Sequence, residues 1–191
     1  LLASSAASDV YKRQVMEGYL RDNEYDLVDR KSTLVDLLVS FIVRDIGIYG
    51  DRKRMYLCFG TPLIPGDTVG PMVGTLIKDD VEHVYGDVDR PILATNVDEV
   101  IKSIEKENYE VICVDASLAM SKENGSIKIE QKGIVPACFT NSAEVGNISI
   151  KGLTDSMFHA DRDIVTLQAT SIAYIILEAE RRLKRLEQRK N

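Results

Sequence analysis

The chain has 191 residues, of which 45% are hydrophobic and 28% charged, a composition typical of one globular domain with a sizeable core. Its net charge of −6 argues against a nucleic-acid or anionic-membrane partner, because both attract clustered lysine and arginine. No apolar run reaches the ~18 residues of a membrane-spanning helix, and three cysteines provide no disulfide framework, so we expect a cytoplasmic protein.

The first residues are expected to lie outside the natural protein. Residues 4–14, SSAASDVYKRQ, resemble a translated sequencing adaptor, so we set residues 1–14 aside from the fold prediction. The remainder is expected to form a single globular unit, made of an N-terminal helical segment over 15–53 and an α/β domain over 54–191.

Helical and strand-like patterns alternate through the first half of the chain. Apolar residues at helical spacing predict a helix over 32–46 with Ser32 as its N-cap, and the run MYLCF predicts a strand over 55–59. A loop over 60–67 leads into a short helix over 68–79, in which Pro71 suits only the first turn. Short strands are then expected at 81–85 and 91–95. Asn96 is expected to cap a helix that ends near residue 108.

The second half continues this alternation. Residues 110–116, EVICVDA, are almost continuously apolar, which is typical of a parallel strand buried on both faces. The pattern SIKIEQ predicts a strand with one solvated face over 126–131, and ISI predicts another over 148–150. Helical spacing predicts a long helix from Asp161 to about Gln188. This order of elements indicates an α/β domain with a mainly parallel sheet.

Two aspartates occupy chemically favourable places in this arrangement. Asp67 lies in the loop after the first strand, and Asp115 lies near the end of the strand over 110–116. Sites in open α/β sheets form beyond the carboxyl ends of the strands, and two neighbouring carboxyl groups can supply an acid and a base together. Such a pair could activate water against an amide carbonyl. A simpler interpretation, with Asp67 capping the next helix and Asp115 bracing a loop, is about equally compatible with the spacing.

Other chemistries have less support from the sequence. The stretch GTPLIPGDTVG does not fit a phosphate-binding loop, because Asp67 stands where that motif needs lysine. The two histidines, His83 and His159, do not have zinc-binding spacing, so neither a metal nor a cofactor is predicted. Cys138, the one cysteine in a predicted loop, is a weak candidate for a nucleophile.

Four segments together resemble a known family. GTPLIPGDTVGPMVGTLI, VYGDVDRPILATN, VICVDASLA and VGNISIKGLTD follow one another as in the YyaC-type sporulation proteins of spore-forming Firmicutes, over about residues 54–175. Those proteins resemble in turn the germination protease that degrades small acid-soluble spore proteins, and the hydrogenase maturation proteases. The resemblance implies a three-layer α/β fold of the phosphorylase/hydrolase type and an aspartate-dependent endopeptidase.

The same resemblance assigns roles to individual residues. It places the catalytic aspartates at Asp67 and Asp115, the acids already selected. The predicted substrate-binding residues are those that would shape the loop presenting Asp67, together with one polar neighbour: Gly60, Thr61, Gly66, Gly70 and Asn96. The chain departs from its relatives at residues 133–136, where a histidine is expected, and at 136–141, PACFTN, where they carry a glycine-rich loop.

The resulting hypothesis is a cytoplasmic endopeptidase that acts during sporulation on a protein or peptide, such as a spore protein, without a cofactor. Nucleic acid and membrane are not expected as partners, and formation of a homo-oligomer is left open. One alternative is a non-catalytic member of the fold that binds a peptide or protein, which the altered loop 136–141 favours. Another is a metal-dependent hydrolase that uses the same two acids.

Overall fold

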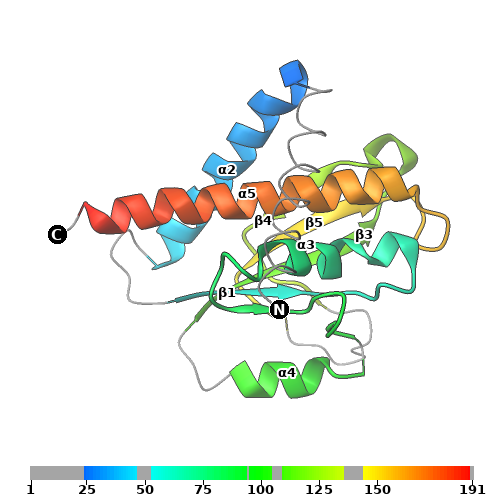
Figure 1. The fold of residues 1–191 in the computed structure, drawn as a ribbon, viewed down its shortest axis with the longest axis horizontal. Coiled ribbons are helices and arrows are strands. Elements are labelled where there is room, and N and C mark those ends of the chain that lie inside the picture. The colour runs from blue at the N-terminus through cyan, green and yellow to red at the C-terminus, as the bar shows by residue number, and fades with distance from the viewer. Residues whose placement is uncertain (1–23, 47–52, 94, 105–108, 136–143, 190–191) are drawn as a thin grey trace, which may run out of the picture.

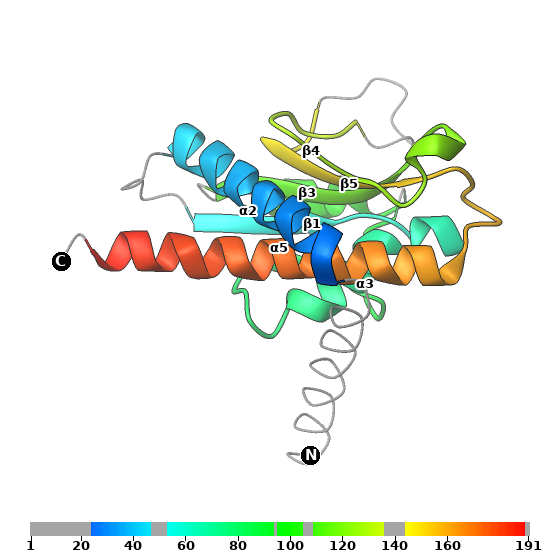
Figure 2. The ribbon, with the colours of Figure 1, turned by 90° about the horizontal axis from the view of Figure 1, so that it is seen from above.

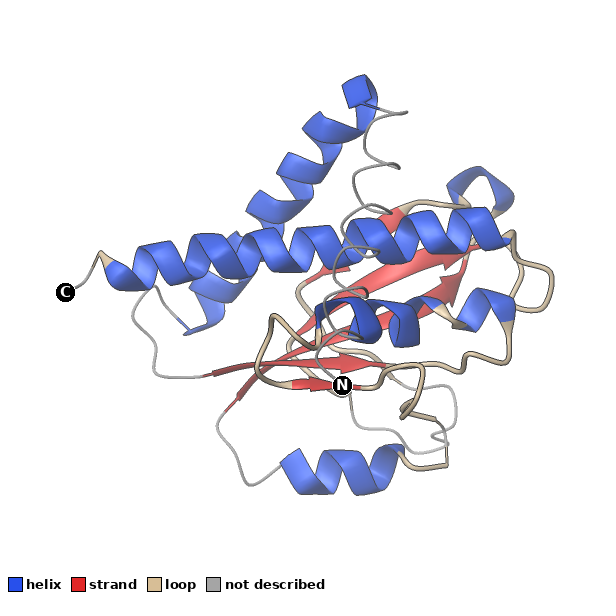
Figure 3. Cartoon of the chain, in the orientation of Figure 1, coloured by secondary structure: helices blue, strands red, loops and turns tan. Residues whose placement is uncertain are grey.

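The computed structural model describes residues 24–46, 53–93, 95–104, 109–135 and 144–189 (Figure 1). Helices and strands alternate through most of these residues, as Figure 3 shows, so the predicted α/β class is confirmed. None of the helices in these ranges is both long and apolar enough to cross a membrane. In chain order the elements are α2 (Glu24–Ile46), β1 (Lys53–Cys58), η1 (Pro65–Asp67), α3 (Val69–Ile77), β2 (Val84–Tyr85), α4 (Val97–Ile104), β3 (Tyr109–Leu118), η2 (Ser121–Glu123), β4 (Ile127–Glu130), β5 (Ile148–Thr154) and α5 (Arg162–Gln188).

The strands form a five-stranded sheet in the order β2-β1-β3-β5-β4. The first four strands are parallel and β4 pairs antiparallel with β5, so the prediction of a mainly parallel sheet is confirmed. β3 occupies the centre, which explains its almost continuous apolar sequence: a central parallel strand is covered on both faces.

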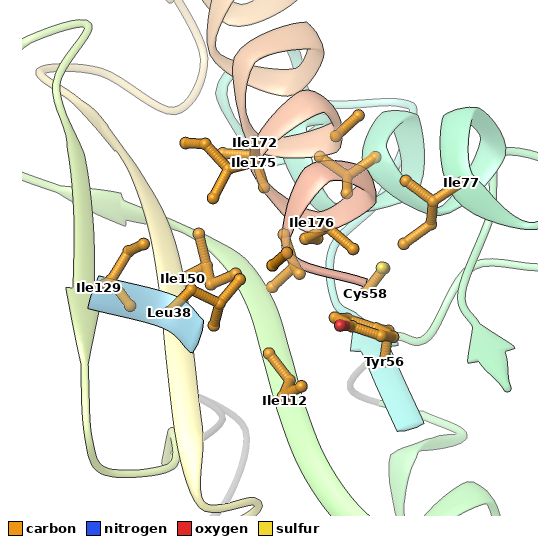
Figure 4. Close-up of a cluster of buried hydrophobic side chains, with 14 of the residues drawn as sticks. Leu38, Tyr56, Cys58, Ile77, Ile112, Ile129, Ile150, Ile172, Ile175 and Ile176 are labelled. Atoms are coloured by element: carbon orange, nitrogen blue, oxygen red, sulfur yellow. The ribbon is translucent and has the colours of Figure 1, made fainter. Parts of the chain in front are cut away.

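Helices cover both faces of the sheet and make three layers. On one face, Tyr56, Ile112 and Ile150 join a core with residues of α2, α3 and α5, part of which Figure 4 shows. Figure 2 shows α2 crossing α5, and the two helices are in contact. On the other face, alternate residues of β1, including Leu57, pack against Val97 of α4. The expected three-layer arrangement is therefore present.

α5 begins where the sequence predicts. The Asp161 carboxylate accepts the N–H groups of Asp163 at 2.8 Å and Ile164 at 3.5 Å, which makes Asp161 the N-cap. The helix then buries one stripe of residues, including Ile172 and Ile176, against the sheet.

Two glycines let α3 pack directly on the backbone of the sheet. A Cβ added at Gly70 would lie 2.0 Å from the Phe59 carbonyl oxygen, and one added at Gly74 would lie 1.8 Å from the Gly86 carbonyl oxygen. Pro71 lies in the first turn of α3, where its missing N–H costs no helical hydrogen bond, as predicted. This close packing holds the start of α3, and the loop before it, against the end of β1.

Three predicted elements differ from the structure. The first helix begins at Glu24, so Ser32 lies inside the helix rather than at its N-cap; residues 24–31 contain no glycine or proline to stop it. The strand predicted at 81–85 is reduced to β2. The prediction of a strand at 91–95 is wrong. Ile92 makes an isolated bridge with Phe59, and Pro91 has no N–H that could donate a hydrogen bond to a neighbouring strand.

Candidate active site

Asp67 and Asp115 are positioned by neighbouring strands. β1 and β3 are parallel with Cys58 opposite Val114, and the Phe59 N–H donates to the Val114 carbonyl at 2.8 Å. Asp115 therefore lies beside the point where the chain leaves β1 for the loop that carries Asp67. This is the carboxyl end of the parallel strands, where α/β proteins place their sites. The structure thus brings together the two acids that the sequence selects.

The loop between β1 and η1 folds back so that Asp67 lies over the end of β1. Gly60 has a φ of 125°, and a Cβ added to it would lie 2.1 Å from the Asp67 carbonyl oxygen and 3.1 Å from its Oδ1. The Thr61 N–H donates to Asp67 Oδ2 at 2.9 Å. Only glycine tolerates both this backbone conformation and this contact, so Gly60 and Thr61 hold the Asp67 carboxylate in place.

Gly66 fixes the same loop from its other side. It is buried, its N–H donates to the Met157 carbonyl at 2.7 Å, and an added Cβ would lie 2.5 Å from the Ser156 carbonyl oxygen. Gly66 and Gly70 both lie against protein backbone. Their observed part in the site is therefore to shape the loop, as expected, and any contact of theirs with a substrate stays a prediction.

Asp67 does not cap the helix that follows it. The N-cap of α3 is Thr68, whose side chain makes no capping hydrogen bond, and the Asp67 carboxylate bonds to Thr61 instead. Asp115 Oδ1 accepts the N–H of its own neighbour, Ala116, at 2.8 Å. The simpler interpretation, a helix cap and a loop brace, therefore does not explain the position of Asp67.

Burial shifts the ionisation of both carboxyl groups, and the charge of Asp67 adds to the shift of Asp115. Burial raises the pKa of Asp115 to about 7; the charge of Asp67 adds to this increase, whereas the Ala116 N–H and Lys151 oppose it. Burial also raises the pKa of Asp67, against the Thr61 N–H, which favours the ionised form. Near neutral pH Asp115 is therefore partly protonated and can donate a proton, whereas the Thr61 N–H favours the ionised form of Asp67, which can accept one.

Comparison with known proteins places the chain in a family. Residues 25–182 match the family described as "Protein of unknown function (DUF1256)". The chain belongs to the DUF1256 family. It is 35% identical over 111 residues to "Uncharacterized protein YyaC" of Bacillus subtilis (strain 168), a match that spans 54% of this chain and 54% of that protein. The expected similarity to YyaC is confirmed.

The crystal structure of a NiFe hydrogenase maturation protease, HycI, from Thermococcus kodakarensis KOD1 is similar to this DUF1256 protein with a TM-score of 0.46. The two chains are 16% identical, and the similarity covers 72% of this chain and 97% of that one.

Asn96 is held by its own loop in the DUF1256 protein. The Leu93 N–H donates to Asn96 Oδ1 at 2.8 Å, and Asn96 Nδ2 donates to the Pro91 carbonyl at 3.0 Å. The residue precedes α4, as predicted, but its side chain bonds backward to this loop. Asn96 also lines a cavity of about 460 Å³, together with Tyr85 and Val100. Its observed role is structural, and its predicted contact with a substrate stays a prediction.

The remaining candidates have different outcomes. Within the described ranges, no group of three His, Cys, Asp or Glu side chains is placed to hold a metal ion. Cys58 and Cys113 are free thiols whose pKa values burial raises, which disfavours the reactive thiolate. Cys138 and the departing loop 136–141 lie outside the described residues.

Sequence analysis missed Lys151, the partner of Asp115 on β5. Its Nζ lies 2.9 Å from Glu130 Oε2, and its charge lowers the pKa of Asp115. The alternation of Ile148 and Ile150 with the polar Ser149 and Lys151 indicates that Lys151 lies on the face opposite the isoleucines. Its position beside Asp115 depends on strand order, which this pattern does not determine.

The pKa of Asp115 predicts a pH-dependent stability. The folded protein keeps the Asp115 proton up to about pH 7, whereas the unfolded chain releases it near pH ~4, so this contribution is complete below pH ~4 and is lost as the pH rises through about 7. Asp115→Asn has no proton to lose. Relative to the wild type, we expect it to gain about 4 kcal/mol in free energy of unfolding between pH ~4 and pH ~8. Urea unfolding of both proteins at both pH values measures this gain. If the variant and the wild type differed by the same free energy of unfolding at pH ~4 and at pH ~8, the result would contradict the burial of Asp115.

Proposed function

We propose that this protein is an endopeptidase in which Asp67 and Asp115 activate water for hydrolysis of a peptide bond. The observation that carries the proposal is the pair itself: the Asp115 carboxyl group on β3, with a pKa of about 7 that the charge of Asp67 helps to raise, and the Asp67 carboxyl group in the loop after the neighbouring strand β1. A general acid and a general base with matched positions are the groups that amide hydrolysis requires.

The chemistry needs no group beyond the pair and one water. Ionised Asp67 takes a proton from water while the water oxygen bonds to the carbonyl carbon, and protonated Asp115 gives its proton to the carbonyl oxygen. When the C–N bond breaks, its electron pair stays on nitrogen, which takes the proton from Asp67. Asp115 recovers its own proton as the new carboxyl group forms, so the pair returns to its starting state.

The biological setting of the proposal comes from the family resemblance. The YyaC-type pattern supports a cytoplasmic role during sporulation in a spore-forming bacterium, with a spore protein as the substrate. Proteolysis of isolated spore proteins by the purified chain is the direct test of this substrate class.

A second function, binding a protein partner without cutting it, is favoured by exposed apolar residues at the same end of the sheet. We call Leu63, Leu118, Met120 and Phe158 the apolar rim; their exposed fractions run from 62% to 88%. Hydrogen bonds from Gly66 to Met157 and from Ala119 to Thr154 join the three segments that carry these residues: the loop after β1, the end of β3 with the loop after it, and the loop after β5. Large exposed apolar groups beside a site are typical of protein contacts, so the rim suits either function.

The pH dependence of the cleavage rate is expected to follow the protonation of Asp115. Activity should fall as the pH rises through about 7, because Asp115 loses the proton that it must donate. A panel of internally quenched peptides, followed by fluorescence from pH ~4 to pH ~9, measures the profile. A rate that still rises above pH ~8 would contradict this assignment of the acid.

The same assay separates the remaining alternatives. A chelator is expected to leave the rate unchanged. Activity that disappears with the chelator and returns with a divalent cation would identify a metal-dependent hydrolase. Saturable binding of the peptides with no cleavage at any pH would identify the binding function instead.

A further inference from the structure

A row of charged side chains runs from Asp115 to the edge of the sheet. Asp115 pairs with Lys151 on β5, and Lys151 pairs with Lys128 on β4. Residues that alternate with them, including Ile129 and Ile150, belong to the core on the face covered by α5. Because side chains alternate along a strand, the three charged groups emerge together on the opposite face.

The lysines of this row form a locally positive surface on an acidic protein. We call Lys128, Lys132 and Lys151 the lysine ledge; their Nζ atoms lie 3.1, 3.4 and 2.9 Å from the carboxylate of Glu130. Three ammonium groups around one carboxylate leave a local charge of +2, whereas the whole chain carries −6. Lys151 contributes most to keeping the pKa of Glu130 at about 2, so this carboxylate is ionised at neutral pH.

The outer part of the ledge is accessible to a ligand. The side chains of Lys128 and Lys132 are 56% and 57% exposed, whereas those of Lys151 and Glu130 are 20% and 18% exposed. Neighbouring strands lie ~4.8 Å apart, so the backbone of Lys128 is about 10 Å from that of Asp115. An extended polypeptide advances ~3.3 Å per residue, and about three residues would span this distance.

We propose that the lysine ledge binds a carboxylate of the polypeptide on which the acid pair acts, about three residues from the bond that lies at Asp115. This inference rests on the proposed function, because Asp115 defines where that bond lies. A substrate carboxylate nearer to the bond would be repelled by Asp67 and Asp115, whereas one at the ledge is attracted by positive charge. The arrangement therefore favours substrates by the position of their carboxylate as well as by its charge. An acidic side chain and a free carboxyl terminus offer the same chemistry.

Ion pairing between β4 and β5 is the competing explanation for the lysines. Cross-strand pairs of opposite charge stabilise an antiparallel pair of strands and require no ligand. That role would change the stability of the sheet when Lys128 and Lys132 are replaced. It would leave the choice among peptides unchanged.

The test measures binding and cleavage separately. Fluorescently labelled peptides would be identical except for glutamate or glutamine at two, three or four residues from one shared bond, and a second set would differ only in a free or amidated carboxyl terminus. Fluorescence anisotropy with the Asp115→Asn variant gives Kd without turnover. We expect the peptide with glutamate three residues away to bind roughly three- to tenfold more tightly than its glutamine partner at low salt, with a smaller ratio at high salt.

Substitutions of the exposed lysines connect this preference to the ledge. In the Asp115→Asn background, Lys128→Gln with Lys132→Gln is expected to remove the preference, and Lys128→Glu with Lys132→Glu to reverse it toward a peptide with lysine at the same position. Lys184→Gln is the matched control, because Lys184 is an exposed lysine near the C-terminal end of α5 that lines a different cavity, beside Lys53 and His83. The control should keep the preference.

Each outcome bears on one claim. Equal Kd values for the glutamate and glutamine peptides and for both termini, or a preference that survives the double substitution, would overturn the role of the ledge. A preference confined to the free terminus would assign the carboxylate to the end of the chain, and one confined to glutamate would assign it to a side chain. Peptides that bind as expected but are not cut by the wild type would leave the ledge in place and remove the peptidase.

Discussion

Replacing either Asp67 or Asp115 with asparagine is expected to slow peptide cleavage by about 10²- to 10⁴-fold, the range that one positioned acid or base contributes. Asparagine has nearly the same shape as aspartate but can neither take a proton from water nor give one to the substrate. The double substitution should be little worse than the worse single one, because the two groups act as a unit. Initial rates on one cleaved peptide measure all three variants.

A matched control excludes a general effect of charge at this end of the sheet. Asp155 is an exposed aspartate just after β5, so Asp155→Asn removes the same charge from the neighbouring loop without touching the pair. It should cleave at close to the wild-type rate. Full activity in both Asp67→Asn and Asp115→Asn, in proteins that unfold cooperatively, would remove the proposed mechanism.

The largest expected loss of stability follows from Glu180, in the C-terminal third of α5. Its buried carboxylate accepts from Arg54 Nε at 2.8 Å, from Arg54 Nη2 at 2.9 Å and from the Tyr56 hydroxyl at 2.7 Å. These bonds tie α5 to β1. Glu180→Gln leaves the charge of Arg54, whose side chain is only 12% exposed, partly uncompensated, and we expect it to lower the free energy of unfolding by about 3–5 kcal/mol.

Glu187 provides the control, because it pairs with the same arginine from a more exposed position. Its Oε1 lies 2.9 Å from Arg54 Nη1, and its side chain is 49% exposed. Solvent screens such a pair, so Glu187→Gln should cost less than ~1 kcal/mol. Urea unfolding at neutral pH compares the two variants. Equal losses would show that burial of the Glu180 pair does not determine its contribution.

Elements with a strong local signal were predicted well. The apolar run at 55–59 and the run at 110–116 became β1 and β3, and the periodic segment at 161–188 became α5. Each has a signal that does not depend on distant residues: burial on both faces for the strands, and an apolar stripe with a capping aspartate for the helix.

Elements whose extent depends on distant partners were predicted poorly. The segment at 91–95 resembles a strand locally, yet among its described residues only Ile92 pairs, in an isolated bridge with Phe59. The start of α2 was placed eight residues late, since Ser32 is an acceptable N-cap that the helix does not use. Local propensity cannot decide such cases when tertiary packing outweighs it.

By itself, the sequence determined β1, β3, β4, β5 and most helices of this protein, and it placed one aspartate near the end of a strand and another in the loop after a strand. Only the tertiary structure decided that β1 and β3 are neighbours, that Lys151 lies beside Asp115, and that the pKa of Asp115 rises to about 7. The physical reason is that strand order and burial depend on contacts between residues far apart in the chain. An acid acquires its chemistry from those contacts, because desolvation and neighbouring charge set its pKa.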